Sequence, residues 1–480
     1  MRQYQLNMEE SFEVNRNQEE CFRYISDFST LEEWDHTVIH SEKVSDGPIG
    51  ISTNFDIVLK FGIRNISMKY QITAYEYPNK AILEGVAEGM KAIDTIEVIP
   101  INSTTSKIIW KAEITFTGLL ASIIPYMETP IKKSGAKTIQ GLQSALENNF
   151  PAPNYKPSLK MADGLVLPGL FLFSKYGYQW AKKDWYPNSA SIVGKHIVLT
   201  GATSGLGLAT AEMLAHKGAH LTLIARDKSK AEDTRKKLIK STGNENIAIE
   251  LADLSLLQEV YQLTERLLQK GNSIDVLINN AGALFNERNE TSEGIERSFA
   301  LLLLAPYYLT NRLTPLLQKS EDARVINVSS GGMYTQSIKV EDLEFKNGKY
   351  NGSVAYARAK RGLMIITEQW AKQHSNGDVV FNAMHPGWAD TPGVEASLPG
   401  FYKLTKNILR TPSEGADTIE WLATAKEANQ LNGQFLLDRR PHTTHLFPNT
   451  KVGSTKREEL IRKLDGYVAS FEASLRKIEA

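Results

Sequence analysis

The chain has 480 residues, which is enough for roughly two or three domains with apolar cores of their own. Its 55 basic residues are balanced by 55 acidic ones, so no overall positive charge favours a nucleic-acid partner, and we predict none. Cys21 is the only cysteine, which excludes an internal disulfide and fits a reducing compartment. Residues 1–8 alternate without the basic end and apolar run of a signal peptide, and no segment is long and apolar enough to span a bilayer, so we expect a cytoplasmic protein.

Residues 1–150 predict an antiparallel meander followed by a long helix. Short helical patterns at 18–28 and 31–34 follow a first alternating segment. Pro125 and Pro130 predict a kink or interruption in the closing helical pattern, 119–147. The alternating segments between these helices are 38–44, 53–61, 67–77, 81–86, 92–99 and 106–117.

This order of elements, with the sequences at 14–34, 50–55 and 70–78, resembles the START-like (SRPBCC) superfamily of polyketide cyclases and lipid-transport proteins. The resemblance implies an α+β helix-grip fold, in which a curved sheet holds a long C-terminal helix around an apolar cavity. It therefore implies a hydrophobic-ligand domain over residues 1–150, without a catalytic residue. Asp35, His36 and Glu84 are polar candidates for such a cavity, but the usual placement of these side chains favours solvated or structurally paired roles.

Residues 151–190 predict a connector between two domains. The prolines of 151–157 indicate an extended linker, and an apolar run at 165–173 is followed by aromatic and basic residues up to 183. Segment 165–183 suits either a docking segment that covers an apolar face of a domain or a weak peripheral contact with a membrane. We favour docking, because the run is too short to anchor a protein by itself.

Residues 191–480 alternate between strand and helix patterns, which predicts a doubly wound parallel α/β sheet. Within this region, residues 198–207 predict a strand, a glycine turn and a helix. Gly201 permits the turn, Gly205 leaves room for a pyrophosphate and Gly207 lets the helix pack closely on the strand, with the phosphates at the helix N-terminus. Such a glycine triplet alone also fits an ordinary loop, so the segments that follow decide between the two.

The next predicted strand, 220–225, is followed by Arg226. An NAD site carries an acid at this strand end for the ribose hydroxyl, whereas a 2′-phosphate requires cations. With Lys228 and Lys230 nearby, Arg226 favours NADP(H) over NAD(H), and an ordinary surface cation is the alternative.

Further motifs in the same order resemble the short-chain dehydrogenase/reductase family from about residue 194 to 447. The resemblance implies a Rossmann fold and an NAD(P)-dependent oxidoreductase that interconverts a carbonyl compound and its alcohol. The segments 385–393 and 438–441 resemble its retinol-dehydrogenase-like branch. The family also pairs subunits through the helices that here carry Leu302 and Tyr356, which implies a homodimer.

The same resemblance assigns roles to individual residues. Ser330, Tyr356 and Lys360 correspond to the catalytic set. The implied cofactor-binding residues are Gly201, Thr203, Ser204, Gly205, Leu206, Gly207, Arg226, Asp253, Leu254, Asn280, Ala281, Gly282, Tyr356, Lys360, Pro386, Gly387 and Thr391.

The chemistry of carbonyl reduction requires these catalytic residue types. Tyr356 exchanges a proton with the substrate oxygen, and Lys360, one helical turn away, is expected to lower the pKa of the phenol by its charge. Ser330 is expected to hydrogen-bond the carbonyl oxygen and to hold it for hydride attack.

Leu302 lies where the family carries a fourth catalytic residue, an asparagine. The family's proton relay uses a water held by the main-chain carbonyl at this place. Pro306, four residues later, has no amide hydrogen, so the carbonyl of Leu302 is expected to lack its helical partner. We hypothesise that Pro306 replaces the asparagine in kinking the helix, and a degraded site that only binds nucleotide is the alternative.

Three features complete the interpretation of the second domain. Residues 392–412 predict a substrate lid in which Leu398, Phe401 and Tyr402 form an apolar pocket. His442 and His445 are close in sequence, but no further ligand cluster accompanies them, so we predict a surface loop and no metal. From residue 455 an amphipathic helix with a capping-box pattern is expected to pack on the domain.

The sequence therefore predicts a START-like domain joined to an NADP(H)-dependent oxidoreductase that acts on a small hydrophobic carbonyl or alcohol. The alternative function is a lipid-binding or transfer protein whose nucleotide domain is a non-catalytic sensor or scaffold.

Overall fold

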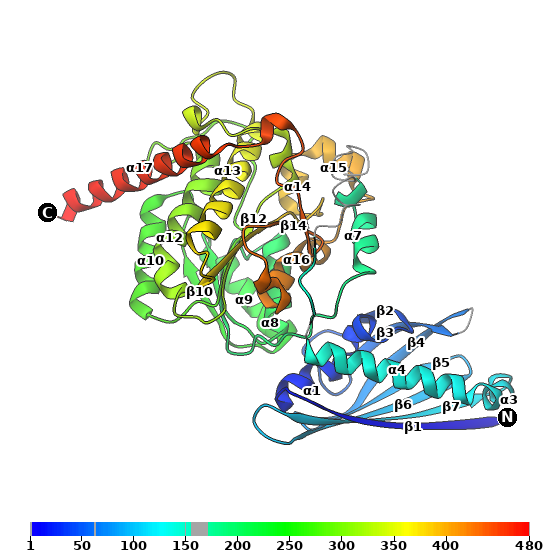
Figure 1. Cartoon of the computed structure of the whole chain (residues 1–480). Helices are drawn as coiled ribbons and strands as arrows, with labels where there is room; N and C mark the ends of the chain where they lie inside the picture. Colours follow the sequence, from blue (N-terminus) through cyan, green and yellow to red (C-terminus); the bar gives the residue numbers. More distant parts are fainter. Residues whose placement is uncertain (1, 62–63, 149, 155–170, 480) are drawn as a thin grey trace. The chain divides into compact units, whose positions relative to one another are not determined.

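The computed structural model describes residues 2–61, 64–148, 150–154 and 171–479 (Figure 1). The chain forms two compact units. The first comprises Met1–Phe150 with Trp185–Ser191 and Lys240–Gly243, and the second comprises Pro151–Asp184, Ile192–Ile239 and Asn244–Ala480.

The first unit is built on an antiparallel sheet in the order β1-β7-β6-β5-β4-β3-β2. Apolar and polar residues alternate along its strands, so one face of the sheet is buried. The helices α1 (Gln18–Ser26), α2 (Leu31–Trp34) and α4 (Glu128–Glu147) accompany this sheet, and Leu142, Ala145 and Leu146 of α4 are buried in the core. The strands are β1 (Gln3–Val14), β2 (Val38–Lys43), β3 (Asn54–Phe61), β4 (Arg64–Glu76), β5 (Lys80–Ala87), β6 (Met90–Pro100) and β7 (Ser106–Thr117).

This arrangement is the START-like helix-grip fold that the sequence predicts, with one difference in the closing helix. The break falls at Pro125 alone, in a short 3₁₀ turn (Ile124–Tyr126) between α3 (Leu120–Ile123) and α4. Pro130 does not interrupt α4, because it is the third residue of that helix, where the backbone amide has no intrahelical acceptor.

A hydrogen-bonded carboxyl group lies inside the first unit. Asp94 on β6 accepts hydrogen bonds from the phenol of Tyr70 (3.0 Å) and the indole of Trp110 (2.9 Å). Burial raises the pKa of Asp94 to about 6, against the lowering effect of these two donors. Asp35, in contrast, has a structural role, since its carboxylate binds Thr37 and the hydroxyl of Thr138 on α4.

The second unit is built on a sheet in the order β10-β9-β8-β11-β12-β13-β14-β15, parallel except for the β14–β15 hairpin. Its inner strands are buried along their whole length, as expected for a parallel sheet covered on both faces. The strands are β8 (His196–Thr200), β9 (His220–Ala225), β10 (Ile247–Leu251), β11 (Val276–Asn279), β12 (Ala323–Val328), β13 (Val379–Met384), β14 (Phe435–Leu437) and β15 (Arg440–His442).

Helices pack on both faces of this sheet (Figure 1). One core contains residues of α8 (Gly205–His216), α9 (Lys228–Thr242) and α16 (Pro412–Thr424). The opposite core contains residues of α10 (Leu257–Lys270), α12 (Ala305–Leu317), α13 (Gly352–Gln373) and α17 (Ser454–Glu479). The fold is the doubly wound Rossmann sheet predicted from the sequence.

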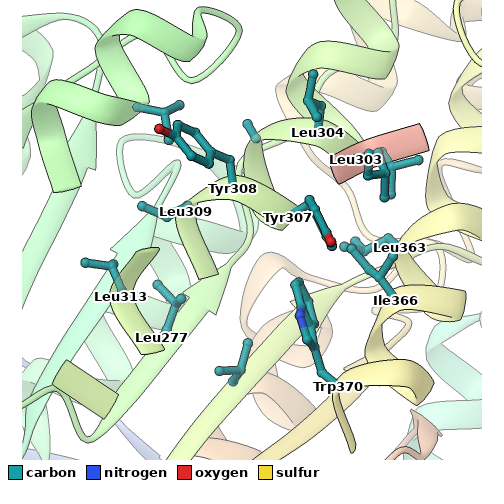
Figure 2. Packing of buried hydrophobic residues seen from close by; sticks show 14 of the residues in the cluster. Leu277, Leu303, Leu304, Tyr307, Tyr308, Leu309, Leu313, Leu363, Ile366 and Trp370 are labelled. Carbon is teal, nitrogen blue, oxygen red and sulfur yellow. The ribbon is translucent and has the colours of Figure 1, made fainter. Parts of the chain in front are cut away.

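Close packing holds α12 and α13 at a fixed spacing. Figure 2 shows Tyr307 of α12 facing Trp370 of α13, and the two rings stack at 5.9 Å with 12° between their planes. Leu460 and Leu464 of α17 are fully buried in the same core, and Tyr307 also donates a hydrogen bond to Asp465 at 2.6 Å. Helix α17 begins at Ser454, so Thr455 lies inside the helix rather than at the predicted cap. No helix among the described residues has the length and apolar composition needed to cross a bilayer.

Candidate active site

A cavity of about 900 Å³ in the second unit lies at the carboxyl ends of the parallel strands. The structure brings all the predicted catalytic and cofactor-binding residues to its wall. They are Arg226, Asp253, Leu254, Gly201, Thr203, Ser204, Gly205, Leu206, Gly207, Asn280, Ala281, Gly282, Pro386, Gly387, Thr391, Ser330, Tyr356 and Lys360.

The glycine turn between β8 and α8 has the geometry of a phosphate cradle. Gly201 and Gly205 adopt positive φ angles of 69° and 52°. A side chain on Gly207 would place its Cβ 2.0 Å from the carbonyl oxygen of Gly201, so only glycine allows this approach of helix and strand. No side chain caps the N-terminus of α8, whose first residues line the cavity. The backbone therefore fits a pyrophosphate, as a dinucleotide site requires.

Thr200 and Asn280 brace this turn from below. The amides of Asn280 and Ala281 both donate to Oγ1 of Thr200 at 2.9 Å, and Nδ2 of Asn280 donates to the carbonyls of Thr200 (2.9 Å) and Gly201 (3.2 Å). The carboxyl ends of β8 and β11 are thereby tied together beneath the site.

At the far end of the cavity, Arg226 follows β9 and is exposed. The neighbouring acid, Asp227, is not among the residues that line the cavity. Its carboxylate accepts a hydrogen bond from the amide of Lys230 at 3.0 Å, at the start of α9. On the other side, the carboxylate of Asp253 is held by the amide (2.9 Å) and hydroxyl (2.7 Å) of Ser255. The β9 end of the cavity therefore offers the guanidinium of Arg226, and the lining also includes the carboxylate of Asp253.

Ser330, Tyr356 and Lys360 meet where β12 is followed by a short 3₁₀ helix and faces α13. The ammonium of Lys360 donates to the carbonyl of Val328 at 2.7 Å and lies 5.8 Å from the ring centre of Tyr356. Burial lowers the pKa of Lys360 to about 8. Burial raises the pKa of Tyr356, and a hydrogen bond with Ser330 acts in the lowering direction. The net pKa of Tyr356 is therefore above its usual value, because desolvation of the phenol dominates.

The helix that carries Leu302 is wound locally as a π-helix, Ala300–Leu304, directly before α12. The amide of Ala305 donates to the carbonyl of Ala300, five residues back, and Pro306 next in line has no amide to give. Leu302 is fully buried, and its side chain lies beneath Gly282. The helix is thus distorted at the place where the sequence predicts a distortion.

The substrate side of the cavity is mostly apolar. Among the residues predicted for the lid, Leu398 and Phe401 line the wall, and Tyr402 lies outside the cavity lining described. The lid consists of two short helices, α14 (Pro392–Ser397) and α15 (Pro399–Thr405). Sequence reasoning missed several lining residues, which are Phe173, Leu284, Phe285, Arg297, Leu301, Trp388 and Val394.

Residues 171–184 of the connector belong to this unit. Residues 155–170, which include the start of the predicted segment 165–183, lie outside the described residues. The buried Arg410 donates to the carbonyls of Leu172 (2.5 Å), Phe173 (3.2 Å) and Ser174 (3.2 Å) and forms a bidentate ion pair with Asp438. No local sequence pattern marks Arg410 as a binding group, because its partners are distant in the chain.

The structure corrects the prediction for His442, which is buried on β15 rather than placed in a surface loop. His445 is only half-buried. In the part of the chain that the structure describes, no three His, Cys, Asp or Glu side chains are grouped closely enough to hold a metal ion.

Comparison with known proteins agrees with this geometry. Residues 195–399 match the family model described as short chain dehydrogenase, and residues 5–147 match the one described as polyketide cyclase / dehydrase and lipid transport. The chain is 40% identical over 308 residues to "Dehydrogenase/reductase SDR family member 12" of Bos taurus, covering 63% of this chain and 96% of that protein. The chain belongs to the short-chain dehydrogenase/reductase family.

Other members of the short-chain dehydrogenase/reductase family are also similar. The human protein of the same name is 41% identical over 308 residues, covering 63% of this chain and 96% of that protein. Human "Retinol dehydrogenase 13" is 31% identical over 261 residues, which cover 52% of this chain and 78% of that protein. The chain is accordingly an NAD(P)-dependent dehydrogenase/reductase that acts on carbonyl or alcohol groups, with a cyclase-like domain N-terminal to it.

Proposed function

We propose that this enzyme uses NADP(H) to interconvert a hydrophobic carbonyl compound and its alcohol. The observation that carries the proposal is the β9 end of the cavity, where Arg226 lines the wall and the carboxylate of Asp227 is occupied at the start of α9. A 2′-phosphate would meet a cation there, whereas the ribose hydroxyl of NAD would lack its usual acidic partner.

The catalytic roles follow from the chain's own groups. Ser330 orients the substrate oxygen, and its own Oγ is held by the amide of Gly332 at 3.1 Å. Tyr356 gives its proton to that oxygen during reduction and removes it during oxidation. Lys360 is fixed by Val328 and supplies positive charge beside the phenol. The nicotinamide supplies or accepts the hydride when it is bound.

An apolar substrate is supported by the apolar side chains in the cavity lining, among them Leu301, Trp388, Leu398 and Phe401. The similarity of the chain to a retinol dehydrogenase supports the same class. For the N-terminal domain we propose capture of an apolar ligand, because its sheet and helix enclose an aromatic core and its sequence matches the lipid-transport family model. Covalent linkage would raise the effective concentration of such a ligand at the reductase.

The experiment is a titration of the full chain with NADPH and NADH, followed through nicotinamide fluorescence, for wild type and Arg226→Ala. We expect preferential binding of NADPH and roughly a tenfold loss of that preference in the variant. Lys240→Ala, in the last turn of α9 outside the cavity lining, is the matched loss of a positive charge and should leave the preference unchanged.

Apolar aldehydes and ketones are then added to the NADPH complex. Oxidation that Tyr356→Phe abolishes would support the catalytic assignment. Tight NADPH binding without turnover of any carbonyl would instead favour the sensor or scaffold function. Equal affinity for the two cofactors in wild type would overturn the assignment of Arg226.

A further inference from the structure

Phe173 lies in the wall of the catalytic cavity although it precedes the matched family model, which begins at residue 195. Its ring meets the imidazole of His385 edge to face at 4.5 Å and the indole of Trp388 at 5.8 Å. Trp388 in turn contacts Phe401 of the lid helix α15 edge to face at 5.3 Å. Phe173, distant in the chain, thus joins the loop of His385 and Trp388 and the lid helix α15 in one aromatic wall.

The main chain of residues 172–174 is held independently of the Phe173 side chain. The guanidinium of Arg410 binds the three carbonyls of this segment, and the amide of Trp388 donates to the carbonyl of Phe173 at 2.7 Å. The amide of Lys175 donates to the carbonyl of Ile408 at 2.9 Å. All these bonds use backbone groups of the connector, so they remain available whichever residue stands at position 173.

The imidazole that packs against Phe173 is neutral. His385 is 3% exposed, and neither of its ring nitrogens has a hydrogen-bond partner within the described structure. Burial and the nearby charge of Arg410 lower the pKa of His385 to about 3, so the ring is neutral. A β-carbon on Gly331, next to the catalytic Ser330, would lie 2.7 Å from its Nε2. A group that packs here from the cavity therefore meets aromatic surface.

We propose that Phe173 is a specificity-determining residue of the reductase, and that the connector completes the substrate pocket by packing this ring against the apolar body of the substrate. This inference rests on the proposed carbonyl reductase function. It assigns as substrates carbonyl compounds with an extended apolar chain or ring system, in preference to short ones. Each apolar group that packs against the wall adds to the discrimination, since one methylene in an apolar pocket changes kcat/KM by roughly tenfold or more.

The test is a ladder of propanal, hexanal and decanal with the full chain and NADPH. Phe173→Ala should lower kcat/KM for decanal at least about tenfold and leave kcat/KM for propanal within about twofold. Phe173→Leu retains apolar bulk, so its kcat/KM for decanal should lie between those of wild type and Phe173→Ala. Phe171→Ala is the matched control, because Phe171 is in the same segment but is 50% exposed, outside the cavity lining described. An equal effect on all three aldehydes, or no effect, would overturn the proposal.

A second readout separates this proposal from the proposed function. The fluorescence of bound NADPH reports formation of the ternary complex without turnover. If wild type oxidises no NADPH, the reductase function fails, and a decanal affinity that falls in Phe173→Ala but not in Phe171→Ala still supports the role of Phe173. A wild type that forms no ternary complex with decanal but reduces other carbonyl compounds contradicts the role of Phe173 alone. Thermal unfolding midpoints of all variants confirm that the compared proteins are folded.

Discussion

The guanidinium of Arg410 passes over the α-carbon of Gly387, where a β-carbon would lie 2.3 Å from Nε. Gly387 also has a φ of +71°, which L side chains rarely adopt. One glycine thus allows the loop predicted to hold the nicotinamide to lie against the arginine that binds the connector. We expect Gly387→Ala to reduce both the stability of this unit, by about 1–3 kcal/mol, and its affinity for NADPH.

Chemical denaturation and NADPH titration of Gly387→Ala measure these two effects. Gly348→Ala is the matched control, because Gly348 has a φ of +85° but no neighbour within 4 Å of the position that a β-carbon would take. Gly348→Ala should lose only the free energy of unfolding that the unfavourable φ angle costs, and its affinity for NADPH should stay unchanged. Equal losses in the two variants would show that the approach of Arg410 is unimportant.

Replacement of Pro306 by alanine restores an amide four residues after Leu302. The new amide can bond the Leu302 carbonyl and convert the π-helix Ala300–Leu304 into an ordinary α-helix. We expect turnover to fall roughly tenfold, because the carbonyl implied in the proton relay is then occupied, with NADPH affinity changed less than twofold. Pro315→Ala, at an exposed position of the same helix α12, should leave turnover unchanged. Unchanged turnover in Pro306→Ala would contradict the role of the proline.

The rate of carbonyl reduction should depend on pH through Lys360. Its ammonium form is present below a pKa of about 8 and is lost as the pH rises through that value. Tyr356 must be protonated to donate, and burial raises its pKa, so the phenol does not limit the rate first. We therefore expect kcat/KM to fall as the pH rises through about 8.

The fall is measured as kcat/KM at pH values from about 6 to about 10, a range that spans the titration of Lys360. Ser330→Ala should lower the whole profile without moving its midpoint, because Ser330 does not supply the charge. Lys360→Arg stays charged throughout and should remove the fall, whatever its absolute rate. A midpoint unchanged in Lys360→Arg would assign the titration to another group.

The buried Asp94 should make the stability of the N-terminal domain depend on pH. Its pKa is raised from 3.8 in the unfolded chain to about 6 in the fold, so the folded state binds the proton more tightly. The favourable contribution is present at low pH and is lost as the pH rises from about 4 to 6, by roughly 3 kcal/mol. Asp94→Asn cannot ionise and lacks this change.

Calorimetric unfolding of the full chain at acidic and neutral pH measures the difference. The free energy of unfolding of wild type minus that of Asp94→Asn should be larger at acidic pH than at neutral pH. Asp56→Asn, at an exposed position on β3, should show no such change relative to wild type. A wild-type advantage that grows toward neutral pH would reverse the assigned sign.

Local sequence patterns predict the helices and strands, and the sequence motifs predict the part of the site that their own residues form. The strand His220–Ala225 and the helix Leu31–Trp34 have the predicted bounds, because burial of alternate or periodic positions leaves a direct mark in sequence. The residues of the glycine turn and the Ser330, Tyr356 and Lys360 set lie on one cavity, since the carboxyl ends of parallel strands meet at one edge of a sheet.

Which distant groups approach one another depends on the tertiary packing. Burial raises the pKa of Tyr356 although a lysine lies one turn away, since desolvation depends on everything packed around the phenol. Arg410 binds the connector, which is far from it in the chain. The antiparallel meander, the parallel α/β sheet and the cofactor turn could be predicted from local periodicity and backbone freedom, whereas the helix-grip fold was implied by the resemblance to the START-like superfamily. The wall of the substrate pocket, with Phe173 in it, follows from long-range packing that no local pattern records.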